Sequence, residues 1–86
     1  MDKLEELRKK IDVLDTQLLQ LIHERLSIVK EVGKLKKERG LKPLDPTRWN
    51  QVIEKVLQQA EQLSMRKEFV KKILDTIHEE ALRIEK

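Results

Sequence analysis

Arg25 is the residue whose position points most directly to chemistry. Apolar residues recur three and four positions apart from residue 4 to residue 35, which predicts a helix with one apolar stripe. In this register Arg25 lies on the stripe, between Leu21 and Ile28, and it is the only polar residue there. A guanidinium that faces a helical core is costly unless an anion meets it. The sequence therefore predicts that Arg25 meets either a carboxylate of the protein or an anionic ligand. The apolar members of the stripe are Leu4, Leu7, Ile11, Leu14, Leu18, Leu21, Ile28, Val32 and Leu35.

Three further cations extend this candidate site. Lys36 follows Arg25 by almost three helical turns, so both side chains point the same way, about 16 Å apart along the axis. Long side chains at that spacing are able to hold a small dianion between them. Arg8 lies about 25 Å from Arg25 along the helix, so it would reach such a ligand only from the second chain of an antiparallel dimer. Arg48 adds a fourth cation at the start of the next expected helix.

The usual catalytic groups are missing beside these cations. The sequence has no cysteine, no Ser–His–Asp arrangement, no phosphate-binding loop and no metal-ligand spacing. The two histidines, His23 and His78, are interpreted as surface or boundary residues. A basic pocket without a nucleophile suits a reaction in which the enzyme holds a dianion in a reactive conformer and stabilises developing charge. We expect neither a cofactor nor a metal.

One long helix and two shorter ones are expected to position these groups, so the predicted fold class is all-α. The long helix covers residues 2–39 and ends at Gly40, a residue typical of helix C-termini. Gly33 inside it predicts a close approach by another backbone or by a ligand. A helix of this length, about 55 Å, is longer than so small a domain is wide, so the remaining residues cannot cover its stripe. We therefore predict an antiparallel homodimer, in which both chains make equivalent contacts.

The second expected helix has a clear start. Asp45 is predicted as its N-cap and Pro46 as its first helical residue, with Leu44 and Trp49 as a hydrophobic staple. This helix is expected to continue to about residue 63.

The third expected helix follows almost directly, with Ser64 as its predicted N-cap. Its apolar face consists of Phe69, Val70, Ile73, Leu74, Ile77, Ala81 and Ile84. The chain has no internal repeat and is expected to form a single domain over residues 1–86.

Composition limits the classes of function. Charged residues make up 41% of the 86 residues and aromatic residues 2%, which is typical of long exposed helices. An apolar fraction of 38% is low for so small a globule, which again favours oligomerisation. Basic residues are not interleaved with aromatic ones and no recognition helix is evident, so nucleic acid is not an expected partner. No membrane span or signal peptide is recognised, and a cytoplasmic location is expected.

Four stretches of the sequence resemble the all-helical chorismate mutases. They are LRKKIDVLD at 7–15, LLQLIHER at 18–25, VGKLK at 32–36 and DPTR at 45–48. The resemblance covers essentially the whole chain. It implies an intertwined helical homodimer that converts chorismate to prephenate, the branch step toward phenylalanine and tyrosine, without a cofactor. Mutase domains of this family are often fused to another enzyme of the aromatic pathway, so a fused or associated pathway enzyme is a further expected partner.

The resemblance also assigns roles to the cations. Arg25 and Arg48 would bind the substrate carboxylates from one chain, and Arg8 would bind a carboxylate from across the dimer. Lys36 would donate a hydrogen bond to the ether oxygen whose bond to carbon breaks, and would also contact a carboxylate.

Other positions are assigned in the same way. Asp45 would contact the ring hydroxyl of the substrate, and Val32 would pack on it. The family usually has a glutamate directly after the arginine of the second helix, where this chain has Trp49. This departure leaves recognition of the hydroxyl to Asp45 and to backbone groups.

Glu85 and Ala81 are the expected contributions of the C-terminal helix. They lie four residues apart on the face of Ile77, where the family usually has a glutamine and a small polar residue. A carboxylate cannot donate a hydrogen bond to an ether oxygen, but a carboxylic acid can. We therefore expect Glu85 to be protonated in the occupied site, activity to fall as pH rises, and Glu85→Gln to flatten that profile. The alternative is that Glu85 is frayed and solvated.

Two other functions remain open at the level of sequence. An isochorismate–pyruvate lyase resembles the same family, and Lys42 would then stand for its loop lysine. A non-catalytic helical dimer that binds a partner would not need a charge on its stripe, so Arg25→Leu should stabilise it.

Overall fold

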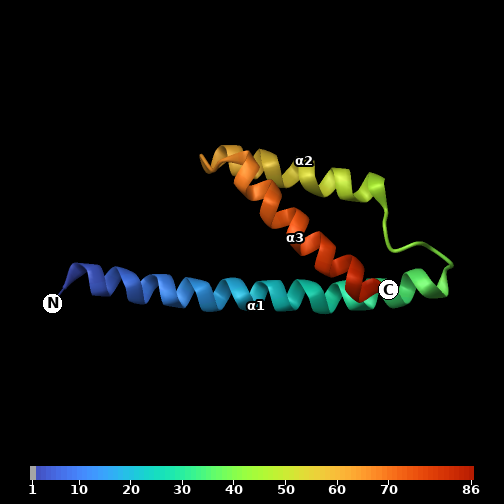
Figure 1. Ribbon diagram of the computed structural model, residues 1–86, viewed down its shortest axis with the longest axis horizontal. Helices are drawn as coiled ribbons and strands as arrows, with labels where there is room; N and C mark the ends of the chain where they lie inside the picture. The colour runs from blue at the N-terminus through green and yellow to red at the C-terminus, as the bar shows by residue number, and fades with distance from the viewer. Residues whose placement is uncertain (1) are drawn as a thin grey trace.

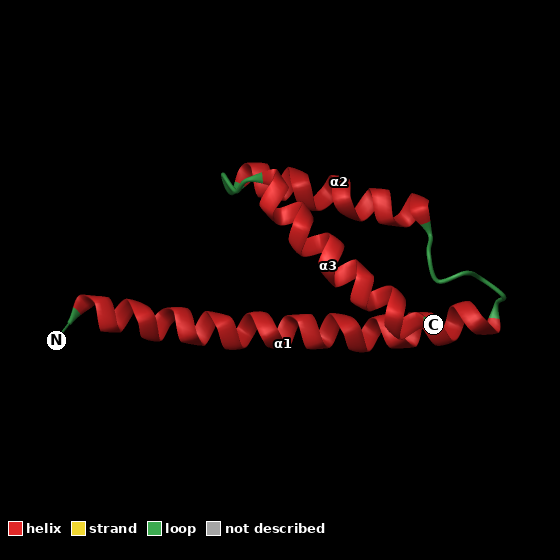
Figure 2. Ribbon diagram, in the orientation of Figure 1, coloured by secondary structure: helices red, strands yellow, loops and turns green. Residues whose placement is uncertain are grey.

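The computed structural model describes residues 2–86, which form three helices and no strand. The helices are α1 (Lys3–Glu38), α2 (Pro46–Gln62) and α3 (Lys67–Glu85). Figure 1 shows α1 as one long rod, with α3 running diagonally back from the far end of α2 until the C-terminus meets α1. The secondary structure in Figure 2 confirms the all-α prediction.

Both ends of α1 are stabilised by local hydrogen bonds. The side chain of Asp2 caps the N-terminus by accepting a hydrogen bond of 3.0 Å from the Leu4 backbone N–H. At the other end Gly40 adopts a positive φ of 68°. Its N–H donates to Lys37 O (3.2 Å), and the Leu41 N–H donates to Lys36 O (2.7 Å). This pair of bonds is the Schellman motif, and it confirms the predicted role of Gly40.

The start of α2 is also as the sequence predicts. Asp45 is the N-cap, and its Oδ1 accepts a hydrogen bond of 3.2 Å from the Arg48 backbone N–H. Pro46 is the first helical residue, where its missing N–H costs nothing. Trp49 stacks on His78 from α3, and Leu44 remains half exposed. The staple between Leu44 and Trp49 stays a prediction.

The predicted N-cap of the third helix is wrong. Ser64 ends α2 instead, with a positive φ of 57°, and α3 begins at Lys67 without a side-chain cap. The Ser64 N–H donates to Glu61 O (3.1 Å) and the Met65 N–H donates to Ala60 O (2.9 Å), which is a second Schellman motif. The physical reason is that the chain must reverse here, and the residue after the C-cap takes the left-handed conformation even though it is not glycine.

Gly33 is a point of close approach between α1 and α3. A Cβ added there would lie 3.2 Å from the Cα of Glu85 and 3.2 Å from its Cγ. Because a side chain would push the end of α3 away, the glycine allows the last turn of α3 to rest on α1. The close approach predicted from the sequence is therefore made by a backbone.

A single chain does not cover its own apolar surface. Its radius of gyration is 16.4 Å and its extents are 59 × 25 × 15 Å, whereas a compact chain of this length has a radius of gyration of about 12 Å. Within residues 2–86, α3 packs against α1 and α2, but these two do not pack against each other. Most of the α1 stripe is exposed, including Leu14 (60%) and Leu18 (58%). In the described part of the chain, no helix has both the length and the hydropathy that crossing a bilayer requires.

Candidate active site

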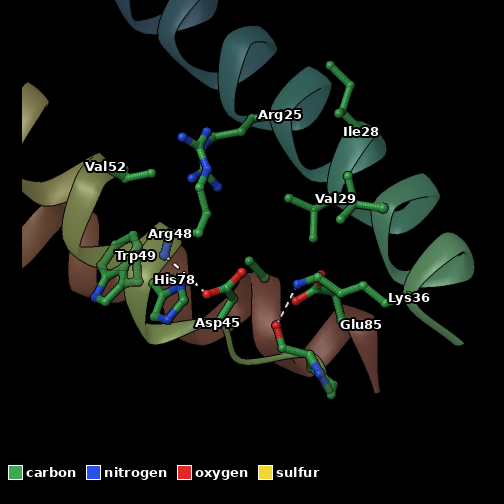
Figure 3. Close-up of a pocket in the computed structure, with 13 residues that line it drawn as sticks. Arg25, Ile28, Val29, Lys36, Asp45, Arg48, Trp49, Val52, His78 and Glu85 are labelled. Carbon is green, nitrogen blue, oxygen red and sulfur yellow. Dashed lines mark hydrogen bonds and ion pairs between the residues drawn. The ribbon is translucent and has the colours of Figure 1, made fainter. Parts of the chain in front are cut away.

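An open pocket of about 280 Å³ lies between the C-terminal half of α1, the start of α2 and the C-terminal half of α3 (Figure 3). All the site residues predicted from the sequence line this pocket, except Arg8. The lining residues are Arg25, Ile28, Val29, Val32, Lys36, Pro43, Asp45, Arg48, Trp49, Val52, His78, Ala81 and Glu85.

Arg25 extends from α1 into this pocket (Figure 3). It is half-buried, and its Nη1 atom is buried without a hydrogen-bond partner. Within residues 2–86 no carboxylate lies at ion-pair distance from it. Of the two partners that the sequence allows, a carboxylate of the same chain is therefore excluded for the described residues, and an anionic ligand or a group of a second chain remains.

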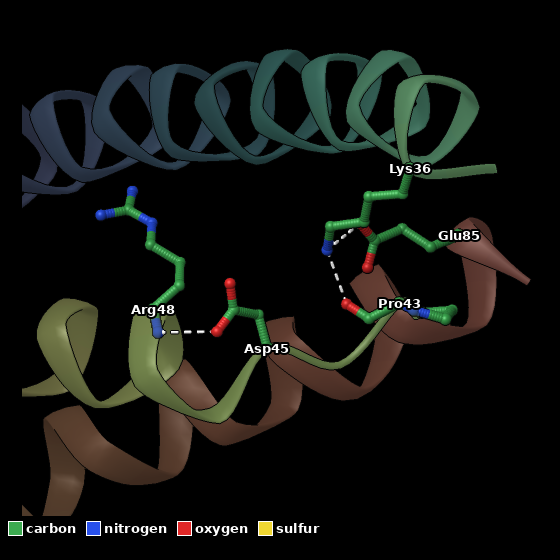
Figure 4. Close-up of polar contacts among 5 residues, drawn as sticks. All are labelled: Lys36, Pro43, Asp45, Arg48 and Glu85. Atoms are coloured by element: carbon green, nitrogen blue, oxygen red, sulfur yellow. Dashed lines mark hydrogen bonds and ion pairs between the residues drawn. The ribbon is translucent and has the colours of Figure 1, made fainter. Parts of the chain in front are cut away.

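Arg48 and Asp45 come from the first turn of α2 and the residue before it. The cap bond from the Arg48 backbone to Asp45 Oδ1 fixes the local backbone, and Figure 4 shows the Arg48 side chain pointing toward α1. Arg48 and Arg25 thus enter the same pocket from opposing helices. Two guanidinium groups placed in this way match a ligand with more than one carboxylate.

Lys36 of α1 links the pocket wall to the end of α3 and to the loop that precedes α2. Its Nζ donates to Glu85 Oε1 (2.8 Å) and to the Pro43 carbonyl oxygen (2.6 Å), as Figure 4 shows. Glu85 is only 7% exposed, so the alternative of a frayed and solvated Glu85 is wrong. The ion pair compensates for the cost of burying the carboxylate and fixes the Lys36 ammonium at the pocket wall.

Trp49 and His78 form a wall of the pocket, and sequence reasoning missed the contribution of His78. Their rings stack with centroids 3.7 Å apart and an angle of 6° between the planes. The pKa of His78 is lowered, first by burial and then by the nearby Arg25 charge. The spacing in the sequence indicates a place for His78 in the pocket. It precedes Ala81 by three residues and Glu85 by seven, so all three lie on one helical face. His23, in contrast, is exposed as expected.

Arg8 lies far from this pocket. It is exposed, it belongs to the N-terminal part of α1, and it does not line the pocket. Its role as a carboxylate ligand therefore requires a second chain.

The pocket as a whole can bind an anion but offers no nucleophile. Three cations, Arg25, Lys36 and Arg48, line it together with two carboxylates, Asp45 and Glu85. One of the two carboxylates is already paired with Lys36. The apolar residues Ile28, Val29, Val32 and Val52 complete the wall. No metal-binding group of acidic residues and histidines occurs between residues 2 and 86. The arrangement can hold a small dianion against apolar walls and stabilise charge that develops on it.

Comparisons with known proteins place the chain in a family. The family described as "Chorismate mutase type II" matches residues 7–86. The chain is 39% identical over 56 residues to a chorismate mutase of Methanocaldococcus jannaschii, covering 65% of this chain and 57% of that protein. It is 39% identical over 57 residues to a bifunctional chorismate mutase/prephenate dehydratase of Aquifex aeolicus, covering 66% of this chain and 16% of that protein. A T-protein of Haemophilus influenzae is 46% identical over 48 residues, covering 56% of this chain and 13% of that protein. The matches thus span less than two thirds of the length of each of these relatives.

Proposed function

Because this chain belongs to the chorismate mutase type II family, we propose that it catalyses the rearrangement of chorismate to prephenate. The observation that carries the proposal is the convergence of Arg25, Arg48 and Lys36 on one pocket, with a buried nitrogen of Arg25 left without a partner. Chorismate is a dianion with an ether bond, and its rearrangement needs no nucleophile, metal or cofactor. The pocket supplies the charge and the shape that such a substrate requires.

The proposed mechanism begins with binding of the two carboxylates. Arg25 and Arg48 hold them from one chain, and Arg8 of the second copy adds a contact. Val32 packs on the substrate, and Ala81 lies on the wall formed by α3. These contacts select the conformer in which the enolpyruvyl carbon faces the ring carbon it will join. The C–O bond then breaks while the new C–C bond forms, so no intermediate is needed.

Lys36 and Glu85 act on the ether oxygen, where negative charge develops as the C–O bond breaks. The Lys36 ammonium donates a hydrogen bond to this oxygen. Glu85 donates a second one only when it is protonated, since a carboxylate has no proton to give. Glu85 Oε1 lies 2.8 Å from Lys36 Nζ, so both groups are held together at the wall where the ether oxygen would lie. Asp45 contacts the ring hydroxyl.

We propose that the active form is an antiparallel homodimer with two equivalent sites. The exposed α1 stripe supports this, because a single chain leaves it open to water. Arg8 also supports it, because this residue does not line the pocket of its own chain and lies about 25 Å along α1 from Arg25. The Aquifex aeolicus relative, whose name includes a prephenate dehydratase, supports a fused or associated enzyme of the aromatic pathway. The cytoplasmic location expected from the sequence stays a prediction.

The test is the loss of chorismate absorbance with purified protein. We expect turnover by the wild type and a loss of about a hundredfold or more in kcat/KM for Arg25→Ala, because a charged ligand group then lacks its partner. Lys30→Ala is the matched control, since Lys30 is an exposed cation of α1 that does not line the pocket. A folded wild type that leaves chorismate unchanged would overturn the proposal.

The lyase alternative is tested in the same assay with isochorismate, by following the release of pyruvate. Lys42, on which this alternative depends, is exposed and is not a lining residue of the pocket. We therefore expect no release of pyruvate.

A further inference from the structure

Two buried side-chain nitrogens in residues 2–86 lack a hydrogen-bond partner, and both belong to residues that line the proposed active site. They are Arg25 Nη1 and His78 Nε2. A buried polar atom without a partner lowers stability unless a ligand supplies one. For Arg25 the proposed carboxylate of the substrate is that partner. His78 has no role so far in the proposed mechanism.

The His78 ring is held in a defined orientation by Trp49. The two rings come from different helices, His78 from α3 and Trp49 from α2, and stack with centroids 3.7 Å apart and planes 6° from parallel. Figure 3 shows the pair on the side of the pocket opposite α1. Stacking restricts rotation of the imidazole, so its ring nitrogens keep fixed directions.

Burial and two nearby cations lower the pKa of His78 and so favour its neutral form. Burial lowers its pKa most, Arg25 and Lys36 from α1 lower it further, and Glu85 and Asp75 from α3 oppose them. The net direction is downward from an ordinary value of about 6.5. A neutral imidazole has one nitrogen that donates a hydrogen bond and one that accepts.

The neutral state of His78 determines which kind of substrate group can form a hydrogen bond with it. The substrate carboxylates are matched by the arginines and by Lys36. A hydroxyl both donates and accepts, so it pairs with Nε2 in either tautomer of the ring. Asp45 has one carboxylate oxygen engaged in the α2 cap, which leaves the hydroxyl room for a second protein contact.

We propose that His78 is a substrate-contacting specificity residue that forms a hydrogen bond through Nε2 with the ring hydroxyl of chorismate. Trp49 is its positioning residue. This inference rests on the proposed function and adds a contact for the part of the substrate that carries no charge.

The experiment combines a variant with a modified substrate. His78→Phe keeps a flat ring against Trp49 but removes the ring nitrogens. Each protein is assayed with chorismate and with a chorismate analogue that lacks the ring hydroxyl. We expect His78→Phe to lower kcat/KM for chorismate about tenfold, and to leave kcat/KM for the analogue within about twofold of the wild type.

Other results separate the explanations. An equal loss of kcat/KM on both substrates would show that the His78 ring is structural and would overturn the hydroxyl contact. Unchanged kcat/KM on both substrates would also overturn the hydroxyl contact. Failure of the wild type to convert chorismate would instead overturn the proposed function. His23→Phe is the matched control, because His23 is the other histidine of the chain and is exposed on α1. Circular dichroism and the oligomeric state of each variant verify that it folds.

A second readout does not depend on turnover. Trp49 is the only tryptophan of the chain, so its fluorescence reports on binding at this wall. Prephenate, which keeps a ring hydroxyl, serves as the probe. We expect its Kd to rise about tenfold in His78→Phe and to stay unchanged in His23→Phe. An unchanged Kd in His78→Phe would contradict the proposal.

Discussion

The two halves of α1 share one helical register but differ in what surrounds them. In the N-terminal half the stripe is open, as at Leu14 and Leu18, and no other part of the chain covers it in Figure 1. In the C-terminal half the same helix is met by α3 at Gly33 and lines the pocket with Arg25 and Lys36. The same 3–4 spacing therefore serves two purposes. The first half is an exposed apolar surface, which we propose a second chain covers, and the second half is one wall of the pocket.

The largest expected effect follows from placing a charge on the open half. Leu18→Lys would bury an ammonium in the proposed dimer interface, so we expect the dimer to dissociate and activity to fall at least about a hundredfold. Light scattering after gel filtration measures the assembly. Thr16→Lys introduces the same charge on the other side of the helix and should leave the dimer intact. A stable, active Leu18→Lys dimer would mean that the stripe is not the interface.

Both halves of α1 contribute to each proposed site, with Arg8 from one chain and Arg25 from the other. Arg8→Ala and Arg25→Ala should each lose most activity alone. Co-expression of the two variants should restore about a quarter of the wild-type activity, because half of the dimers are then mixed and each has one intact site.

The control for this mixture uses Arg25 and Arg48, two arginines that the same chain contributes to each proposed site. Arg25→Ala mixed with Arg48→Ala should recover nothing, because every site then lacks one of them. Equal recovery in both mixtures, or none in either, would argue against a site shared between chains.

A smaller effect is expected at the end of the pocket where α3 meets α1. If Glu85 acts as an acid, wild-type kcat/KM should fall about tenfold per pH unit once the pH exceeds the point at which Glu85 loses its proton. Glu85→Gln should lack this fall. The measurement is kcat/KM between about pH 5 and about pH 9. Glu79→Gln, at an exposed position of the same helix, should behave like the wild type. Identical profiles for wild type and Glu85→Gln would contradict the acid role.

The smallest effect lies outside both halves, in the turn between α2 and α3. Ser64 holds a positive φ that costs a non-glycine residue about 1 kcal/mol. Ser64→Gly should remove this strain and raise the melting temperature by about 4 °C at a fixed protein concentration, with activity unchanged. Ser64→Ala should give no such gain. A lower melting temperature for Ser64→Gly would show that the glycine costs more in the unfolded chain than it recovers in the turn.

What the sequence determined about this protein is what depends on neighbours along the chain. The α1 register, the cap at Asp45, the terminating Gly40 and the common direction of Arg25 and Lys36 all follow from spacings within a few helical turns. Such features are local, because hydrogen bonds and side-chain neighbours in a helix join residues three or four positions apart. Ser64 is the local feature that was predicted wrongly, since serine is favoured as an N-cap and only the observed reversal required it to be left-handed.

The tertiary structure alone decided which distant residues meet. The Lys36–Glu85 ion pair joins positions 49 residues apart, and the Trp49–His78 stack joins two helices. Sequence periodicity gives the face on which each residue lies, but not the angle at which α3 crosses back to α1. That angle is set by packing, including the close approach of Glu85 to Gly33. It brings residues of separate helices together in one pocket.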